Sequence, residues 1–408
     1  MPRTWTGTVI RVARGLVLLA AGTLLFLACW VVVPAPTLLL LPFGVAAPEL
    51  SPALCAISVV VAGIALAGLF GRPGWVAFAL ATLAAMLSAL PLAQLPGALG
   101  GFDTAMAAVR LPGDTSDGPL QGSRTRDFRP RAFSPRDFVV GVERGTSTVR
   151  RAVPFSPAGT APLAADIYYS AQASGEARGY PVLVQIYGGA WQRGRAGDDE
   201  AFARYFASRG YMVMAIDYGH APAAQWPAQI QDVRTALGWV RVHAPDYGGD
   251  PGAVALIGRS SGAQLALLAA YEAGIPQVAG VVSFYGPVYL ADGWRVPPRP
   301  DPLGVRAVLE SYLGGTPAEV PDHYRAASPA TLVSATAPPT LLIYGTRDHI
   351  VEARFARQLD AQLRSAGVPS VLLELPWAEH AFDALPDGLS AQVALFYTER
   401  FLARLFVH

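Results

Sequence analysis

The first hundred residues carry long apolar runs, whereas the rest of the chain alternates short apolar runs with polar segments. Three runs, at 9–33, 50–70 and 75–95, each match the roughly 20 residues that a helix needs to cross a bilayer. Residues 34–48 are also apolar but are broken by prolines, which favours an interfacial or re-entrant segment over a fourth span. The pattern predicts a transmembrane region at 1–97 with about three helices, retained as an anchor and not cleaved as a signal peptide.

The charges around these runs predict how the chain is oriented in the membrane. Arg3, Arg11 and Arg14 precede or open the first run, and excess Arg favours the cytoplasmic side. Residues 98–137 are rich in Gly, Pro, Ser, Asp and Arg without an apolar period, which is typical of a juxtamembrane linker. The arginines of this linker argue against the orientation, but most lie well beyond the third run. We expect a multi-pass protein of the cell membrane with the remainder of the chain extracytoplasmic.

From residue 138 onward the pattern is that of a globular domain. Two alternating segments, 148–155 and 163–169, predict an opening antiparallel pair of strands. Buried-strand patterns then alternate with helical ones. The strands are expected at 182–187, 212–217, 254–258, 278–285, 340–345 and 370–375, and the helices at 199–209, 226–243, 261–272 and 351–366. This alternation predicts an α/β fold at 138–408 with a mostly parallel, doubly wound sheet.

The alternation is interrupted at 286–339. This stretch is rich in proline, has one short helical pattern at 304–312, and contains four large aromatic residues. These are Tyr289, Trp294, Tyr312 and Tyr324. A long segment of this kind inside a compact domain is usually functional or disordered, and the aromatic residues favour order. We therefore predict a lid inserted between two strands of the sheet.

The pentapeptide Gly258-Arg-Ser-Ser-Gly262 is the strongest chemical signal in the chain. An apolar run at 253–257 precedes it and a helical run at 263–270 follows it. In this strand–turn–helix context a Gly-x-Ser-x-Gly sequence projects the Ser260 hydroxyl out of a sharp turn. The amide of Ser261 is then left at the start of a helix, where it can bind an oxyanion.

A serine nucleophile needs a base and a carboxylate that orients the base. Asp348 and His380 each follow a predicted strand, in the chain order Ser, Asp, His. The carboxyl ends of parallel strands meet at one edge of a sheet, so these residues can converge. The other histidines lack this order and setting. Among the rival carboxylates, Asp383, Glu352 and Glu379, the last is expected to be a solvated neighbour of His380.

The loop Tyr187-Gly-Gly-Ala-Trp191 follows the strand at 180–186. Glycines let backbone amides approach a substrate carbonyl, so Gly189 and Ala190 are the expected partners of Ser261 in an oxyanion hole. Tyr187, Gly188 and Trp191 are candidate substrate contacts, although Trp191 could equally pack in the core. Arg259, beside the nucleophile, is either structural or a substrate contact.

Seven short stretches, in order, resemble the α/β-hydrolase superfamily, and specifically carboxylesterases similar to hormone-sensitive lipase and related small-acyl esterases. They are Tyr187–Trp191, Ala215–Tyr218, Asp246–Pro251, Gly258–Gly262, Ala327–Pro329, Tyr344–Asp348 and Glu379–Phe382. The resemblance spans about residues 150–400 and implies an α/β-hydrolase fold and ester hydrolysis. The family usually has His at the position of Tyr187, where it orients the loop. Tyr can donate one hydrogen bond there, so we expect the oxyanion hole to survive.

Composition excludes several other classes of protein. The formal net charge is +1, which does not suggest a nucleic-acid partner. Cys29 and Cys55 both lie in apolar runs and predict neither a disulfide framework nor a cysteine metal site. The chain has no Lys and no Asn, a bias typical of GC-rich genomes, and we expect a bacterial source. No metal or organic cofactor is expected.

Together these features predict a membrane-anchored serine hydrolase that cleaves carboxylic esters through an acyl-enzyme, with a small-molecule or lipid ester as substrate. Two alternatives remain open. The same three side chains could serve a serine peptidase, or an acyltransferase acting on cell-envelope substrates. The change to Tyr187 also leaves open a catalytically inactive binding protein with a hydrolase fold.

Overall fold

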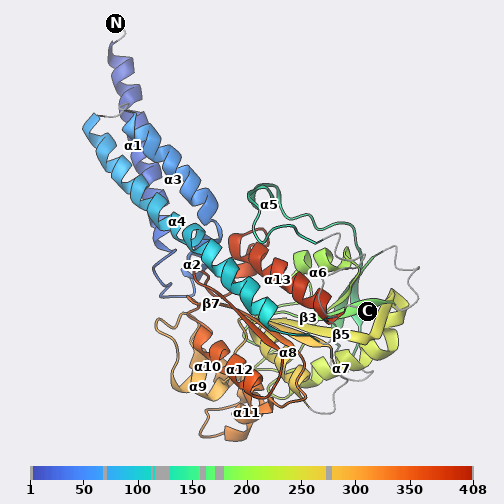
Figure 1. The fold of residues 1–408 in the computed structure, drawn as a ribbon. Helices are drawn as coiled ribbons and strands as arrows, with labels where there is room; N and C mark the ends of the chain where they lie inside the picture. Colours follow the sequence, from blue (N-terminus) through green and yellow to red (C-terminus); the bar gives the residue numbers. More distant parts are fainter. Residues whose placement is uncertain are drawn as a thin grey trace.

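The computed structural model describes residues 3–67, 71–111, 114, 128–156, 162–170, 179–272 and 278–406. A long bundle of apolar helices stands on one side of an α/β domain, with the N-terminus at the far end of the bundle (Figure 1). Part of the predicted linker, namely 112–113 and 115–127, lies outside the described residues.

The bundle consists of α1, α2, α3 and α4. Their bounds are Arg3–Cys29, Leu41–Glu49, Ser51–Leu66 and Gly71–Ala108. Alanines such as Ala28 and Ala84 are fully buried where the long helices meet, because small side chains let helix backbones approach closely. Two helical segments, Thr8–Cys29 and Gly74–Ala108, are long and apolar enough to cross a membrane.

A third crossing depends on the bent pair α2 and α3, whose axes meet at 77°. The 16 residues of α3 extend about 24 Å, less than the roughly 30 Å of a hydrocarbon core. The second predicted span, 50–70, thus corresponds to a shorter helix preceded by a short apolar helix across a sharp turn. The described residues therefore contain two long spans, or three if the bent pair counts as one.

The helix α4 is longer than the third predicted span and continues to Ala108. Beyond residue 97, Phe102 and Met106 are buried in the core of the α/β domain, and Leu99 packs beside them. These three residues recur at helical spacing, but the neighbouring glycines favoured our prediction of a linker. The boundary that we predicted at residue 97 is therefore wrong, because one helix belongs to both parts.

The α/β domain contains one sheet of eight strands in the order β1-β2-β4-β3-β5-β6-β7-β8. In chain order the strands are Thr148–Pro154, Ala164–Tyr169, Tyr180–Ile186, Met212–Ile216, Gly249–Arg259, Gly280–Phe284, Thr340–Gly345 and Ser370–Leu375. The pairs β1–β2 and β2–β4 are antiparallel and the rest are parallel. The predicted doubly wound α/β fold is confirmed.

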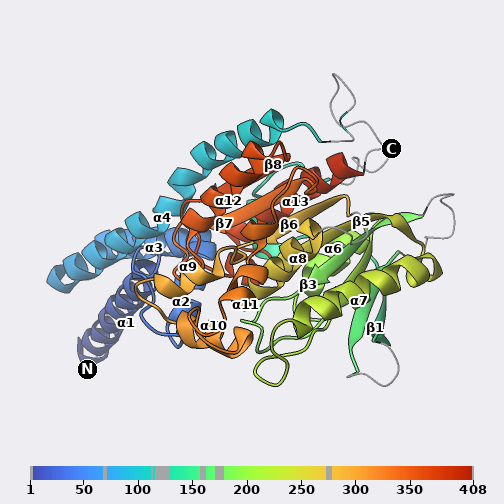
Figure 2. The same ribbon diagram turned by 90° about the horizontal axis from the view of Figure 1, so that it is seen from below.

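Helices cover both faces of this sheet. In Figure 1, α6 (Glu200–Ala207) and α13 (Leu389–Leu405) lie above it. The view from below in Figure 2 shows α7 (Ala228–His243), α8 (Ser261–Tyr271) and α12 (Ala353–Ser365) on the opposite face. The strands β3, β4, β6 and β7 and the part of β5 from Val254 onward are almost fully buried between these layers, as expected for a parallel sheet.

The insertion between β6 and β7 contains three short helices, not the single one that we predicted. They are α9 (Leu290–Arg295), α10 (Val305–Leu313) and α11 (Pro321–Ala326). Two of them have only six residues, too few for a helical period to be recognisable in the sequence. The aromatic residues order the insertion as expected, since Tyr312 and Tyr324 are completely enclosed.

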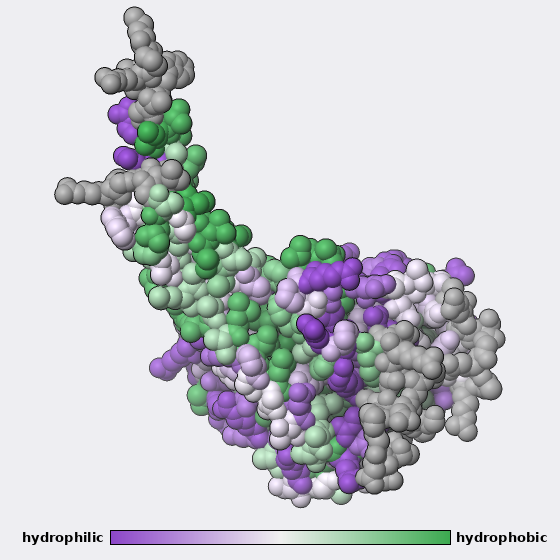
Figure 3. Space-filling model, turned by 45° about the horizontal axis from the view of Figure 1, so that its top comes forward, coloured by the Kyte–Doolittle hydropathy of each residue, from purple (hydrophilic) through white to green (hydrophobic). Residues whose placement is uncertain are grey.

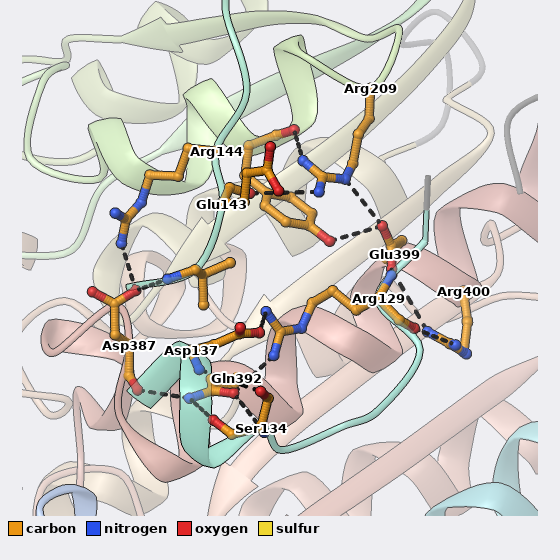
Figure 4. A network of polar contacts seen from close by, with 12 residues as sticks. Arg129, Ser134, Asp137, Glu143, Arg144, Arg209, Asp387, Gln392, Glu399 and Arg400 are labelled. Carbon is orange, nitrogen blue, oxygen red and sulfur yellow. Dashed lines mark hydrogen bonds and ion pairs between the residues drawn. The ribbon is translucent and has the colours of Figure 1, made fainter. Parts of the chain in front are cut away.

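Residues 128–147, here called the strap, contact α13 at Gln392 near its start and at Glu399 and Arg400 in its C-terminal half, and include the short helix α5 (Pro135–Val140). Arg129 is buried, with its guanidinium 2.7 Å from the Gln392 amide oxygen and 3.0 Å from the Asp137 carboxylate (Figure 4). Arg144 forms an ion pair with Asp387 at 2.8 Å. Residues 128–137, the C-terminal part of the predicted linker, are therefore fixed to the α/β domain.

Several polar contacts join the bundle to the α/β domain, including a hydrogen bond from Tyr397 to Asp103 of α4 at 2.8 Å. Glu49 is fully buried and accepts a hydrogen bond from the Ser390 amide at 2.7 Å, at the start of α13. The Arg347 guanidinium donates to the carbonyl of Val32. Arg404 donates to carbonyls near the end of α4, including that of Met106. The bundle is thus attached directly to the loops that follow β7 and β8.

Candidate active site

The nucleophile candidate lies in a strained turn. The strand β5 ends at Arg259, α8 begins at Ser261, and Ser260 between them has φ 50° and ψ −121°. A non-glycine residue at positive φ costs on the order of 1–3 kcal/mol and persists where the surroundings enforce it. The next glycine is required by space, because a Cβ atom at Gly262 would lie 2.3 Å from the Ile186 carbonyl oxygen. The predicted turn is therefore present.

The structure brings the three predicted triad residues together in one hydrogen-bonded chain. The Ser260 Oγ lies 2.9 Å from the Nε2 atom of His380. The Nδ1 atom of that imidazole lies 2.8 Å from Asp348 Oδ2. The other Asp348 oxygen accepts hydrogen bonds from the amides of Ile350 and Val351, at 2.8 and 2.7 Å. The carboxylate is thus fixed by its own loop while it orients the imidazole.

His380 is buried among carboxylates. Burial alone would lower its pKa, but the charge and hydrogen bond of Asp348 outweigh burial and raise the pKa above its ordinary value. Glu379 and Asp383 add to this effect. A raised pKa makes the imidazole a stronger base and stabilises the imidazolium that forms when it takes a proton.

Glu379 is not the solvated neighbour that we expected, since it is only 5% exposed. Its Oε1 atom accepts hydrogen bonds from the His349 amide at 2.7 Å and the His380 amide at 2.9 Å. Its Oε2 atom lies 2.6 Å from His349 Nδ1, and this hydrogen bond raises the pKa of His349. Glu379 therefore joins the two loops that carry Asp348 and His380. This role of Glu379 could not be predicted from the sequence, because its partner His349 lies 30 residues earlier in the chain.

The glycine-rich loop after β3 lies against the nucleophile. Its residues Gly189, Ala190 and Trp191 have φ values of 150°, 56° and 58°. A Cβ atom at Gly189 would lie 1.9 Å from the Arg193 carbonyl oxygen, and one at Gly188 would lie 3.0 Å from the Ser260 Cβ. The loop is therefore close enough to Ser260 for backbone amides to reach a substrate carbonyl. Donation from Gly189, Ala190 and Ser261 to an oxyanion stays a prediction.

Tyr187 supports this loop from behind. Its hydroxyl lies 2.9 Å from the Nε2 atom of His220, and its ring stacks on Tyr218 with centroids 4.5 Å apart. The Tyr218 hydroxyl donates to the Tyr187 carbonyl at 3.2 Å. Tyr187 is buried and makes a hydrogen bond at the position of the family histidine, as we expected, whereas its contact with a substrate stays a prediction. Sequence order excluded His220 as the base but could not reveal this second role.

A pocket of about 540 Å³ opens at Ser260. Ala190 and Trp191 form one side, and the remaining lining is largely apolar and comes from the insertion and the region after β7. It includes Val288, Leu290, Leu303, Val305, Val308, Leu309, Ile350, Val351 and Phe355. Trp191 also stacks on Tyr312, with ring centroids 4.1 Å apart, and donates to the Gln264 side chain at 3.0 Å. Both predicted roles of Trp191 therefore apply, since it lines the pocket and packs in the core.

Arg259 points away from this pocket, which corrects its candidacy as a substrate contact. Its guanidinium lies 2.6 Å from Asp383 and 3.3 Å from Asp199, and it lines a second cavity with them. The same Asp383 accepts a hydrogen bond from Tyr285, whose ring centroid is 4.6 Å from that of His380. Asp383, considered only as a rival triad member, thus supports the imidazole through an aromatic neighbour.

Among the described residues, no group of three or more His, Cys, Asp or Glu side chains could hold a metal ion. The side chains around Ser260 are instead arranged for nucleophilic attack and proton transfer.

Comparison with known proteins agrees with this geometry. The family model BD-FAE matches residues 165–363. Esterase LipQ of Mycobacterium tuberculosis is 30% identical over 327 residues, which cover 73% of this chain and 76% of LipQ. The chain belongs to the α/β-hydrolase carboxylesterases.

Other carboxylesterases of this family extend the comparison. The probable carboxylic ester hydrolase LipM of Mycobacterium tuberculosis is 37% identical over 240 residues, or 55% of this chain. The match spans only about half of LipM, 54% of its length. The solved structure of the esterase Est2 of Thermogutta terrifontis superposes with a TM-score of 0.53 at 25% identity, covering 65% of this chain and 94% of Est2.

Proposed function

We propose that this carboxylesterase is a membrane-anchored serine hydrolase that uses Ser260, His380 and Asp348. The observation that carries the proposal is the unbroken hydrogen-bonded chain from the Ser260 hydroxyl through the imidazole to the Asp348 carboxylate. It opens into an apolar pocket, and the nucleophile lies in a strained turn. These features match the requirements of acyl transfer by an activated serine.

The geometry supports a two-step reaction. The Ser260 Oγ attacks the ester carbonyl carbon while His380 Nε2 takes the hydroxyl proton, and the amides of Gly189, Ala190 and Ser261 receive the oxyanion. Collapse of the tetrahedral intermediate breaks the bond to the alkoxide, which takes the proton from His380 and departs as the alcohol. Water then attacks the acyl-enzyme with His380 as base, which releases the acid and restores Ser260.

The apolar pocket indicates which part of the substrate it binds. Leu303, Leu309 and Phe355 offer no charged group to a ligand, so the pocket suits the acyl chain of a small-molecule or lipid ester. The bundle would keep the enzyme at a membrane, where apolar esters accumulate.

The bundle also supports an orientation. Its helices α1, α3 and α4 lie side by side, with the N-terminus and the catalytic domain at opposite ends (Figure 1). If all three cross the bilayer, the two ends lie on opposite sides. Arg11 and Arg14 favour a cytoplasmic N-terminus, so the catalytic domain would be extracytoplasmic.

The test is ester hydrolysis by the full-length protein, with nitrophenyl esters of graded acyl length beside the matching anilides. The variant Ser260→Ala is expected to lose activity by on the order of 10⁶-fold in kcat, as for removal of other activated serines. Ser261→Ala is the matched control, because it keeps the backbone amide and removes only a hydroxyl near Tyr218. Full activity in Ser260→Ala would reject the proposal, and faster cleavage of anilides than of esters would favour a peptidase.

A further inference from the structure

The strap carries an exposed apolar tip that the proposed chemistry does not use. Val139 and Val140, at the end of α5, are 79% and 68% exposed. Arg131 and Arg136 are exposed on the same short segment. Single exposed valines are common, but two adjacent ones flanked by exposed arginines form a small amphipathic surface.

This tip is held in place by a buried network (Figure 4). The Ser134 hydroxyl accepts a hydrogen bond from the Asp137 amide at 3.2 Å and so begins α5. The side-chain oxygen of Gln392, on α13, accepts hydrogen bonds from the Ser134 amide at 2.9 Å and from Arg129 at 2.7 Å. Arg129 in turn pairs with Asp137. The strap therefore fixes α5 firmly to α13 while the two valines project outward.

The position of α5 relative to the bundle indicates what the tip meets. In the view of Figure 1, α5 lies on the side of the catalytic domain from which the bundle extends. In the space-filling view, hydrophobic surface covers the bundle and continues onto this side of the catalytic domain (Figure 3). The turn before α2, at the end of the bundle nearer the catalytic domain, also exposes Leu39, by 84%. Exposed apolar side chains therefore lie near the end of the bundle that adjoins the catalytic domain, where the surface of a bilayer would be.

We propose that α5 is a second, peripheral membrane contact, which rests on the proposed insertion of the bundle. Val139 and Val140 enter the boundary between headgroups and acyl chains, and Arg131 and Arg136 face the lipid phosphates. A second contact, rigidly held by the strap, fixes the domain relative to the bilayer and keeps the loops after β7 and β8 near its surface.

The test compares three cysteine positions in full-length protein with Cys29→Ala and Cys55→Ala. Val140→Cys probes the strap, Leu19→Cys probes α1, and Val242→Cys is the matched aqueous control. Val242, on α7 away from the bundle (Figure 1), is 67% exposed, almost the same as Val140. Each protein carries a polarity-sensitive fluorophore and is reconstituted into phosphatidylcholine–phosphatidylglycerol vesicles that contain lipids brominated near the headgroup.

The label at position 140 is expected to be quenched at least about twofold more strongly than the label at 242, with emission shifted to shorter wavelength. Equal behaviour of 140 and 242, with the label at 19 in a lipid environment, would overturn the proposal and leave the anchor intact. An aqueous environment at 19 would instead refute insertion of the bundle itself. Replacing both Arg131 and Arg136 with Gln should weaken the quenching at 140 and leave that at 19 unchanged.

Discussion

The helices α3 and α8 are both strongly apolar, yet they lie in opposite surroundings. Every residue of α8 except Ala270 is buried, between the sheet and α7. In contrast, α3 exposes Ile57, Val59 and Val60 by half or more, because only neighbouring helices of the bundle cover it. Hydropathy therefore shows that a segment avoids water but not whether protein or lipid surrounds it. Segment length and the neighbouring elements distinguish the two cases.

The two regions consequently differ in what stabilises them. Large aromatic residues such as Trp377 and Phe401 fill the catalytic domain, and its buried charges are paired. The bundle packs largely through alanines, with a few larger residues such as Leu24 and Leu54, and leaves many of its other large side chains exposed. We therefore expect the largest effects in the catalytic domain from substitutions of its buried polar residues. In the bundle we expect them from charged substitutions on its surface.

The largest effect is expected at the polar centre, from Asp348→Asn. Asparagine can still accept from the amides of Ile350 and Val351, but it no longer stabilises the imidazolium and favours the wrong tautomer of His380. We predict a fall in kcat of about 10⁴-fold with little change in KM, by analogy with the same change in other serine triads. Asp322→Asn, on the surface of α11, is the control and should have wild-type kinetics. A loss of less than tenfold would contradict the proposed role of Asp348.

A smaller effect should distinguish the lipid-facing surface of the bundle from the water-exposed surface of the catalytic domain. Leu19 in α1 and Val242 in α7 are 66% and 67% exposed, so Asp at either position removes the same amount of internal packing. In a membrane, Leu19→Asp should disfavour insertion by about 3–4 kcal/mol, because Asp is unfavourable there and the favourable contribution of Leu is lost. On a water-exposed surface, Val242→Asp should change stability by less than about 0.5 kcal/mol. The fraction of protein resistant to carbonate extraction measures the difference, and equal fractions for both variants would show that α1 does not face lipid.

The smallest effect concerns the pH dependence of the catalytic centre. His380 must be neutral to take a proton, so activity falls as the pH drops through its pKa, which lies above the ordinary value of 6.5. Glu379 is one of the charges that raise this pKa, so Glu379→Gln should move the acid limb of kcat/KM to lower pH. Glu374→Gln, which alters a carboxylate paired with Arg357, is the control. An acid limb that stays in place or moves to higher pH would contradict the account.

Sequence patterns predicted those parts of the molecule that depend on local periodicity and chain order. The strands, the turn at Ser260 and the positions of Asp348 and His380 after their strands belong to this class. The roles of Glu379, Asp383 and His220 did not follow from the sequence, because each depends on a partner brought close only by folding. Segments with weak periodicity were also missed, including the six-residue helices α9 and α11 and the end of α4.

The central claim is that Ser260 is an activated nucleophile, and active-site labelling tests it most directly. Full-length protein in detergent is treated with a fluorophosphonate probe, and the modified residue is located by peptide mass spectrometry. The account predicts covalent labelling at Ser260 that is lost in Ser260→Ala, is strongly slowed in His380→Ala and persists in Ser261→Ala. A folded protein that remains unlabelled at Ser260, or is labelled equally well without His380, would contradict it.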